Sequence, residues 1–242
     1  MGDLNVRTKL FAALAILTAS APALAADLET SPAPAMAGSP AAIVYNWTGL
    51  YLGIHAGGGW SKMAGKDPTV PGDPWVWANG TGAIAGGQLG FNYQINNVVL
   101  GAEGTYAWSN VGVSDGGPFA GGSGLTVKLR NDYVATAAGR IGYAFNRLLL
   151  FAKGGGAWTR DRIDANDGIG GTATGRFNRS GWLAGAGVEF AFLQNWSVRA
   201  EYDYMRFGQI NEVLTTTGGL GVTPAVVKLD MQMVLLGLNY RF

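Results

Sequence analysis

The sequence predicts an all-β protein, an eight-stranded antiparallel up-and-down transmembrane β-barrel, and three observations support this prediction. Eight segments alternate apolar and polar residues with the two-residue period of a β-strand. The connections between the segments alternate between short and long. The apolar faces carry small aliphatic residues flanked by Trp and Tyr, a pattern typical of a lipid-facing band between two aromatic girdles.

The eight predicted strands are Leu50–Trp60, Gly80–Tyr93, Val98–Ser109, Leu125–Phe145, Leu148–Thr159, Ser180–Phe192, Trp196–Phe207 and Lys228–Phe242. Single-chain bacterial barrels have an even number of strands. The last segment is the clearest of the eight. Leu236, Leu238 and Tyr240 alternate there with Gly237 and Asn239, and the alternation runs to the aromatic carboxyl terminus.

The connections indicate an orientation. Three of them are tight, Asn-containing turns, at Gln94–Asn97, Asn146–Arg147 and Leu193–Asn195. The other four, at 61–79, 110–124, 160–179 and 208–227, are long. Short turns of outer-membrane barrels face the periplasm, so we expect the long connections on the cell surface and both chain ends on the periplasmic side.

The charges decide which face points outward. A soluble lipocalin-like barrel also has eight up-and-down strands, but its apolar face points inward. Here the polar faces combine Gly with both signs of charge, whereas a solvent-exposed face would carry Lys and Glu at many positions. We therefore predict that the polar faces line the lumen. The predicted lumen charges are Glu103, Lys128, Arg130, Asp132, Arg140, Lys153, Glu189, Arg199, Glu201, Asp203 and Arg241.

Two arrangements of these charges are open. Eight strands enclose little more than their own side chains, and unpaired buried charges are costly, so pairing across the barrel is the favoured expectation. An open channel is the alternative. A third hypothesis is a lipid-modifying barrel enzyme, which would use a His with a Ser and an acid. His55 is the single histidine, and we predict no catalytic residues.

The amino end predicts export. Arg7 and Lys9 precede an apolar run from Leu10 to Ala19, and Ala23-Leu24-Ala25 fits a signal-peptide cleavage pattern. That run is too short to cross a bilayer as a helix. We expect a signal peptide at residues 1–25, a flexible Pro/Ala-rich periplasmic tail at 26–46, and the barrel at 47–242.

Composition excludes several kinds of site. The 242-residue chain has no cysteine, which excludes disulfides and thiolate metal sites, and one histidine excludes multi-histidine metal sites. The formal charge is +1, which argues against nucleic acid as a partner. No metal or cofactor is expected. Aspartates of the long connections, among them Asp161, could bind divalent cations, but solvated charges are the favoured interpretation.

Several motifs resemble one family. They are the entry sequence Trp47-Thr48-Gly49-Leu50-Tyr51-Leu52-Gly53, the stretch from Gly82 to Tyr93, Ala200-Glu201-Tyr202 and the closing strand. Together they are similar to the small outer-membrane immunogenic proteins of alphaproteobacteria, which are grouped with porin-family and OmpA-like barrels. The resemblance implies the location and the fold. It also implies that Tyr240 and Phe242 are an assembly signal recognised by the barrel assembly machinery.

We therefore expect an outer-membrane barrel with a structural and surface-interaction, antigenic role. The alternatives are a small porin for passive diffusion of solutes and a lipid-modifying enzyme. The expected partners are outer-membrane lipid and lipopolysaccharide, the barrel assembly machinery, and host or surface ligands that reach the long loops.

Overall fold

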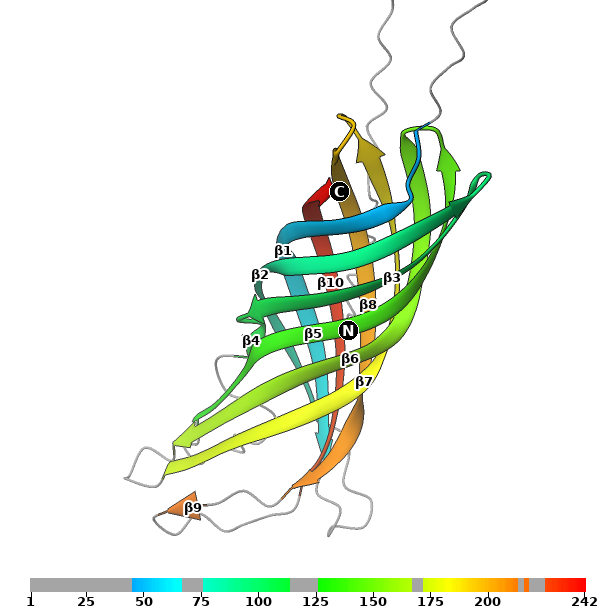
Figure 1. Ribbon diagram of the computed structural model, residues 1–242. Helices are drawn as coiled ribbons and strands as arrows, with labels where there is room; N and C mark the ends of the chain where they lie inside the picture. The colour runs from blue at the N-terminus through cyan, green and yellow to red at the C-terminus, as the bar shows by residue number, and fades with distance from the viewer. Residues whose placement is uncertain (1–44, 67–75, 114–125, 167–171, 213–215, 218–224) are drawn as a thin grey trace, which may run out of the picture. The chain divides into compact units, whose positions relative to one another are not determined.

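The computed structural model describes residues 45–66, 76–113, 126–166, 172–212, 216–217 and 225–242. The predicted signal peptide and residues 26–44 of the predicted tail lie outside the described residues. The described residues form one antiparallel sheet that closes on itself (Figure 1). Its eight long strands are β1 (Gly49–Lys66), β2 (Val76–Ile95), β3 (Val98–Ser109), β5 (Thr126–Phe145), β6 (Leu148–Asn166), β7 (Thr172–Ala191), β8 (Trp196–Glu212) and β10 (Ala225–Arg241).

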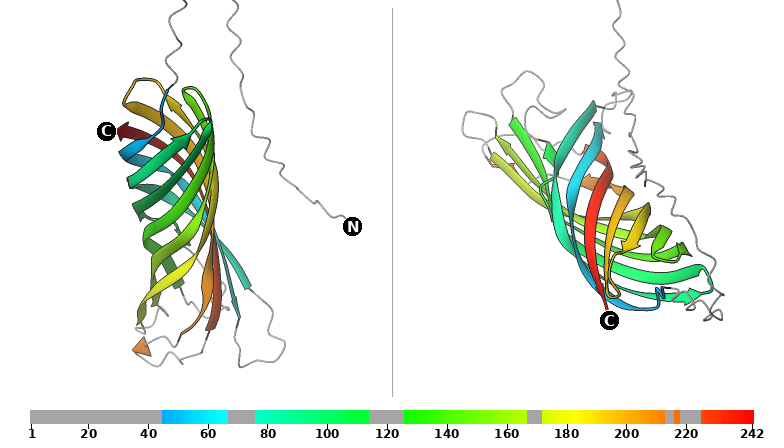
Figure 2. Two further views of the ribbon diagram at one scale, coloured as in Figure 1. Left: turned by 45° about the vertical axis from the view of Figure 1, so that its right-hand side comes forward. Right: turned by 90° about the horizontal axis from the view of Figure 1, so that it is seen from above.

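The strand order confirms the predicted up-and-down barrel. Each long strand pairs with its neighbours in the chain, and β1 pairs with both β2 and β10, which closes the ring. Phe242 adds a further backbone bond, donating its N–H to the Leu50 carbonyl at 3.0 Å. Two views from other directions show the strands arranged around a common interior (Figure 2). None of the described residues form a helix long and apolar enough to cross a membrane.

The strands are longer than predicted at one end. β6 continues to Asn166 instead of ending at Thr159, and β7 begins at Thr172 instead of Ser180. The long connections were overestimated because polar residues there end the apolar alternation without ending the backbone ladder. Two short strands within the predicted loops were also missed, β4 (Gly112–Val113) and β9 (Thr216–Thr217).

The opposite end holds the tight turns, and we call it the turn end. Asn96 and Asn146 adopt positive φ values of 54° and 55°, and Asn tolerates this left-handed conformation better than most residues. The C-terminus lies at the same end (Figure 1). The other end, where β6 ends, β7 begins and β9 lies, is the loop end (Figure 1).

The two faces of the strands follow the predicted parity, except in β5 before its irregularity at Asn131. Along β1, Leu52 and Ile54 are exposed on the outside, whereas Tyr51 and His55 are buried inside. Aromatic rings gather outside near both ends. Trp182 and Tyr204 lie toward the loop end with ring centroids 5.5 Å apart, and Trp196 lies 5.1 Å from Tyr240 toward the turn end. The outer surface therefore has an apolar band between two aromatic girdles.

The interior is layered. A polar layer lies in the middle, and an apolar cluster lies on its loop-end side. Moving toward the loop end along β8 and β10, the inward residues change from Glu201 and Asp203 to Met205, Phe207, Met231 and Leu229. The whole apolar cluster is Ile84, Ala107, Val111, Val134, Ala138, Ala157, Leu183, Met205, Phe207, Leu229, Met231, Met233 and Leu235. The sequence predicts polar lumen faces throughout, and the apolar layer corrects that prediction.

Candidate functional site in the barrel interior

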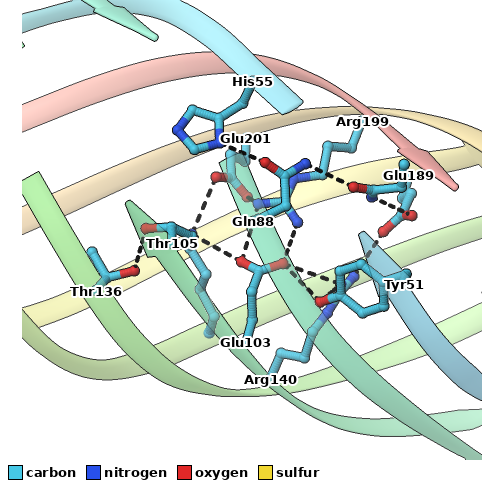
Figure 3. Close-up of polar contacts among 12 residues, drawn as sticks. Tyr51, His55, Gln88, Glu103, Thr105, Thr136, Arg140, Glu189, Arg199 and Glu201 are labelled. Atoms are coloured by element: carbon cyan, nitrogen blue, oxygen red, sulfur yellow. Dashed lines mark hydrogen bonds and ion pairs between the residues drawn. The ribbon is translucent and has the colours of Figure 1, made fainter. Parts of the chain in front are cut away.

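The polar layer draws on all eight long strands. Its side chains approach one another in the middle of the barrel (Figure 3). They are Tyr51 and His55 of β1, Gln88 of β2, Glu103 of β3, Arg140 of β5, Lys153 of β6, Glu189 of β7, Ser197, Arg199, Glu201 and Asp203 of β8, and Asn239 of β10. All are buried. We call this set the central network.

Glu103 is the hub of the central network. Both terminal nitrogens of Arg199 donate hydrogen bonds to the Glu103 carboxylate. The distance from Nη2 to Oε1 is 3.0 Å. The Tyr51 hydroxyl donates to Oε2 at 2.7 Å, and Arg140 donates to the Tyr51 oxygen at 2.9 Å. Lys153 lies 3.7 Å from the other carboxylate oxygen. Bidentate, charge-assisted bonds of this kind are the strongest available to a buried carboxylate.

Lys153 joins two further carboxylates to this hub. Its Nζ lies 3.1 Å from Glu201 and 2.9 Å from Asp203. Arg199 Nη2 also forms an ion pair with Glu201 Oε2 at 2.8 Å. A buried charge without a partner would be costly, and these paired contacts offset that cost.

Glu189 extends the central network toward the turn end. It accepts bonds from Arg140 at 3.0 Å, Ser197 at 2.6 Å and Asn239 at 2.9 Å. Gln88 then donates to Asn239 at 2.7 Å and contacts the His55 Nδ1 through its carbonyl oxygen. The partner of His55 is therefore the side-chain amide of Gln88, and the partner of Ser197 is the carboxylate of Glu189.

Glycines give these long side chains their space. A Cβ at Gly185 would collide with the Asp203 carboxylate and stand 3.1 Å from the Lys153 Cε. A Cβ at Gly53 would collide with the side chains of Asn239 and Gln88. The glycines of the polar faces are therefore part of the packing of the central network.

The predicted lumen charges fall into three groups. Seven of them meet in the central network: Glu103, Arg140, Lys153, Glu189, Arg199, Glu201 and Asp203. Arg130 and Asp132 were placed on the wrong face, because an irregularity between Asn131 and Tyr133 shifts the register of β5. Arg130 is exposed, and Asp132 pairs on the outside with Arg162 at 3.8 Å. The side chain of Lys128 lies outside the described residues.

The third group is Arg241, which lies at the turn end. Its guanidinium stacks over the rings of Tyr45 and Trp47, 4.3 Å and 5.6 Å from their centroids. It also donates to the Gln194 carbonyl at 3.1 Å. Arg241 therefore contacts the chain segment that precedes β1 instead of the central network.

That segment, Tyr45 to Trp47, covers the interior at the turn end, and we call it the N-terminal cover. Both aromatic side chains are buried against Val99, Ala144, Leu149 and Ala191. The Tyr45 N–H donates to the Asn146 side chain at 2.9 Å, and the Trp47 indole donates to the Asn146 carbonyl at 3.0 Å. Burial raises the pKa of the Tyr45 hydroxyl above its ordinary value.

Sequence reasoning missed several of these residues. Tyr51, Gln88 and Asn239 carry no charge, and only their inward parity could have identified them. Asp161 was assigned to a loop, yet it is buried at the loop end, where it pairs with Arg179 and accepts a bond from Asn131. The extension of β6 and β7 beyond their predicted ends places both residues inside the barrel. Over the described part of the chain, no group of His, Asp and Glu side chains is arranged to hold a metal ion.

Comparison with known proteins agrees with this architecture. Residues 11–242 match the model of the outer membrane protein beta-barrel domain. The chain belongs to this family. It is 33% identical to the 31 kDa outer-membrane immunogenic protein of Brucella melitensis biotype 1, over 98% of this chain and 100% of that protein. It is 30% identical to the 25 kDa outer-membrane immunogenic protein of Brucella abortus biovar 1, over 98% and 99%.

A solved structure of the family's fold is also similar. The outer membrane protein OprG from Pseudomonas aeruginosa aligns with a TM-score of 0.52 at 15% identity, covering 83% of this chain and 99% of that one. The family match and the two Brucella relatives show that the protein is an outer-membrane β-barrel, as the resemblance implied. The outward apolar band and its girdles have the arrangement of a lipid-facing surface.

Proposed function

We propose that this outer-membrane barrel has a structural and surface-interaction role and that its lumen is closed to solutes. The central network carries this proposal, because side chains from all eight long strands meet in it. A pore would have to pass between Glu103, Arg199 and Lys153, whose contacts cross the interior. Eight strands leave little space beyond their inward side chains.

Two further layers support closure. On the loop-end side, Met205, Met231 and Met233 are at most 3% exposed within the apolar cluster. At the turn end, the N-terminal cover packs over the interior. Apolar and charged layers in series would each oppose the passage of a hydrated solute.

The surface role follows from the loop end. The relatives are named immunogenic proteins, and an antigen on intact cells must be reachable from outside. We propose that the loop end faces the cell surface and displays the connections between strands. A catalytic role is not part of the proposal. Within the described residues, His55 contacts Gln88, and Ser197 bonds to Glu189.

Planar-bilayer recording of the refolded protein tests closure. We expect no stable unitary conductance steps, whereas a known porin refolded and inserted in the same way gives steps under the same conditions. Folding is checked first by heat-modifiable electrophoretic migration. Stable steps from the folded wild-type barrel would contradict closure and favour the small-porin alternative.

A further inference from the structure

A row of three arginines crosses the outer surface near the loop end. Arg130 of β5 is paired directly with Arg162 of β6, and Arg162 is paired directly with Arg176 of β7. Arg130 and Arg176 are exposed, Arg162 is half-buried, and all three lie on the outward face. Directly opposed residues of neighbouring strands have Cβ atoms about 4.5–5.5 Å apart, and like charges at such positions destabilise a sheet.

Nearby acids compensate this repulsion only in part. Asp132 contacts Arg162 at 3.8 Å, at the outer limit of an ion pair, and both side chains are a third or more exposed. Asp164 lies beside Arg162 and Arg176. Counting Arg160, which bonds to Asn178, the described outward face here carries four arginines and two aspartates. The surplus of positive charge fits an anionic ligand.

The same place holds a hollow of about 350 Å³. It is lined by Arg162, Asp164, Thr174, Gly175 and Arg176. The lining thus combines two guanidinium groups with a hydroxyl and a carboxylate. Guanidinium groups bind phosphate through paired hydrogen bonds, and the hydroxyl and carboxylate suit the hydroxyl groups of a sugar.

The row lies just beyond the aromatic girdle. Arg160 stacks on Tyr133 at 5.5 Å, and the exposed Trp158 comes two residues earlier on β6. Arg162 is four residues from Trp158, or about 13 Å along a tilted strand. Girdle aromatics mark the membrane–water interface, so this distance places the guanidinium groups at the level of lipid headgroups.

We propose that Arg130, Arg162 and Arg176 form a binding site for phosphate groups, presented by phosphorylated glycolipid headgroups of the surrounding leaflet. A headgroup with two phosphates would engage neighbouring arginines and relieve their repulsion. Its sugar hydroxyls would meet Thr174 and Asp164. The site is on the outside of the barrel, so it does not depend on whether the lumen conducts, but it rests on the proposed orientation of the loop end toward the cell surface.

Native mass spectrometry of the refolded barrel in detergent tests the site, with diphosphoryl lipid A as the probe. We expect the triple variant Arg130→Gln/Arg162→Gln/Arg176→Gln to bind it at least about tenfold more weakly, because each charge-assisted bond contributes to affinity. The matched control is Arg206→Gln, which removes another exposed outward arginine, one paired with Asp230. The control should bind like the wild type, and all three proteins should show heat-modifiable migration.

Two further arms identify the chemistry. Dephosphorylated lipid A should bind the wild type and the triple variant equally. Inorganic pyrophosphate distinguishes a lipid from a free anion: arginine-dependent binding of pyrophosphate as tight as that of the lipid would keep the phosphate site and overturn its lipid source. Equal binding of diphosphoryl lipid A to the wild type and the triple variant would overturn the site itself, as would an equal loss in Arg206→Gln.

Discussion

Arg199 and Glu103 form a bidentate ion pair across the interior of the barrel. They belong to β8 and β3, which are separated by three strands in either direction around the ring. Neither strand pairs with the other, so the contact joins opposite walls through side chains alone. The Arg199–Glu103 pair therefore links two strands that no backbone hydrogen bonds link, because backbone ladders join only neighbouring strands.

Removing one partner of this pair should destabilise the barrel strongly. We expect Glu103→Gln to lower the free energy of unfolding by about 3–5 kcal/mol, because it breaks a fully buried bidentate ion pair. The double variant Glu103→Gln/Arg199→Gln should lose less than the sum of the two single changes. Urea unfolding in lipid vesicles measures all three.

The control is the outward pair of Arg206 and Asp230, whose side chains are 58% and 32% exposed. Solvent-exposed pairs contribute little, so Asp230→Asn should leave the unfolding transition nearly unchanged. Additive effects of Glu103→Gln and Arg199→Gln would show that the two residues act independently.

The N-terminal cover should protect the interior at the turn end. The protein has no cysteine, so a single introduced thiol reports its own accessibility. We expect a thiol at the fully buried Val99 to resist a water-soluble maleimide, and to react quickly once Tyr45→Ala and Trp47→Ala remove the cover. The reaction rate in the folded protein is the measurement.

A thiol at Gln194, in an exposed turn at the same end, is the control and should react at the same rate with and without the cover. Rapid labelling at Val99 in the presence of both aromatic residues would mean that the cover does not seal this end.

The fold could be predicted from sequence because alternation over many residues leaves few alternatives. β3 was predicted with its observed bounds, and two of the tight turns have an Asn, Asn96 and Asn146, in the left-handed conformation. The misplaced Arg130 and Asp132 show the limit of parity. One irregular residue in β5 reverses the faces beyond it, and nothing in the local composition marks such a shift.

The contents of the interior were less predictable. Charges could be assigned to the lumen, but their partners depend on which strands stand opposite each other, as Glu103 and Arg199 do. The N-terminal cover was not predicted, because Tyr45 was assigned to the flexible tail and Trp47 to the start of the first strand motif, and neither was expected to be buried. Their burial results from contacts with Asn146 and Leu149, a hundred residues away.

Charge on the outer face should be costly in a depth-dependent way. Ala186 is exposed in the middle of the apolar band of β7, so Ala186→Arg should cost about 2–4 kcal/mol near the bilayer midplane. Ser180→Arg, outward on the same strand but near the loop-end girdle, should cost much less. Unfolding in lipid vesicles compares the free energies of the two variants. A spin label that is more accessible to water at Ala186 than at Gly187 would reverse the face assignment.

Phe242 should matter for assembly more than for the finished barrel. Its side chain is 73% exposed and touches Tyr240 edge-on at 5.1 Å, so few packing contacts are lost without it. If assembly machinery reads this residue, deleting it should lower the yield of heat-modifiable protein in the outer membrane and increase periplasmic degradation. Phe242→Tyr keeps an aromatic terminus and should restore the yield; full yield from the deletion would remove the assembly role.

The loop end should be the end that faces the outside of the cell. Protease added to intact cells should cut within the connections β1–β2, β3–β5, β6–β7 or β8–β10, because length is tolerated where no assembly constraint limits it. It should spare the turns at Gln94–Asn97, Asn146–Arg147 and Leu193–Asn195, which stay behind the membrane. These turns are also held by backbone bonds, such as that from the Ala144 N–H to the Asn97 carbonyl at 2.7 Å. Permeabilised cells separate protection by the membrane from protection by structure: the turn end becomes accessible there to an antibody against the C-terminus. Cleavage at the tight turns of sealed cells, with the loop end intact, would invert the topology and end the surface-display proposal.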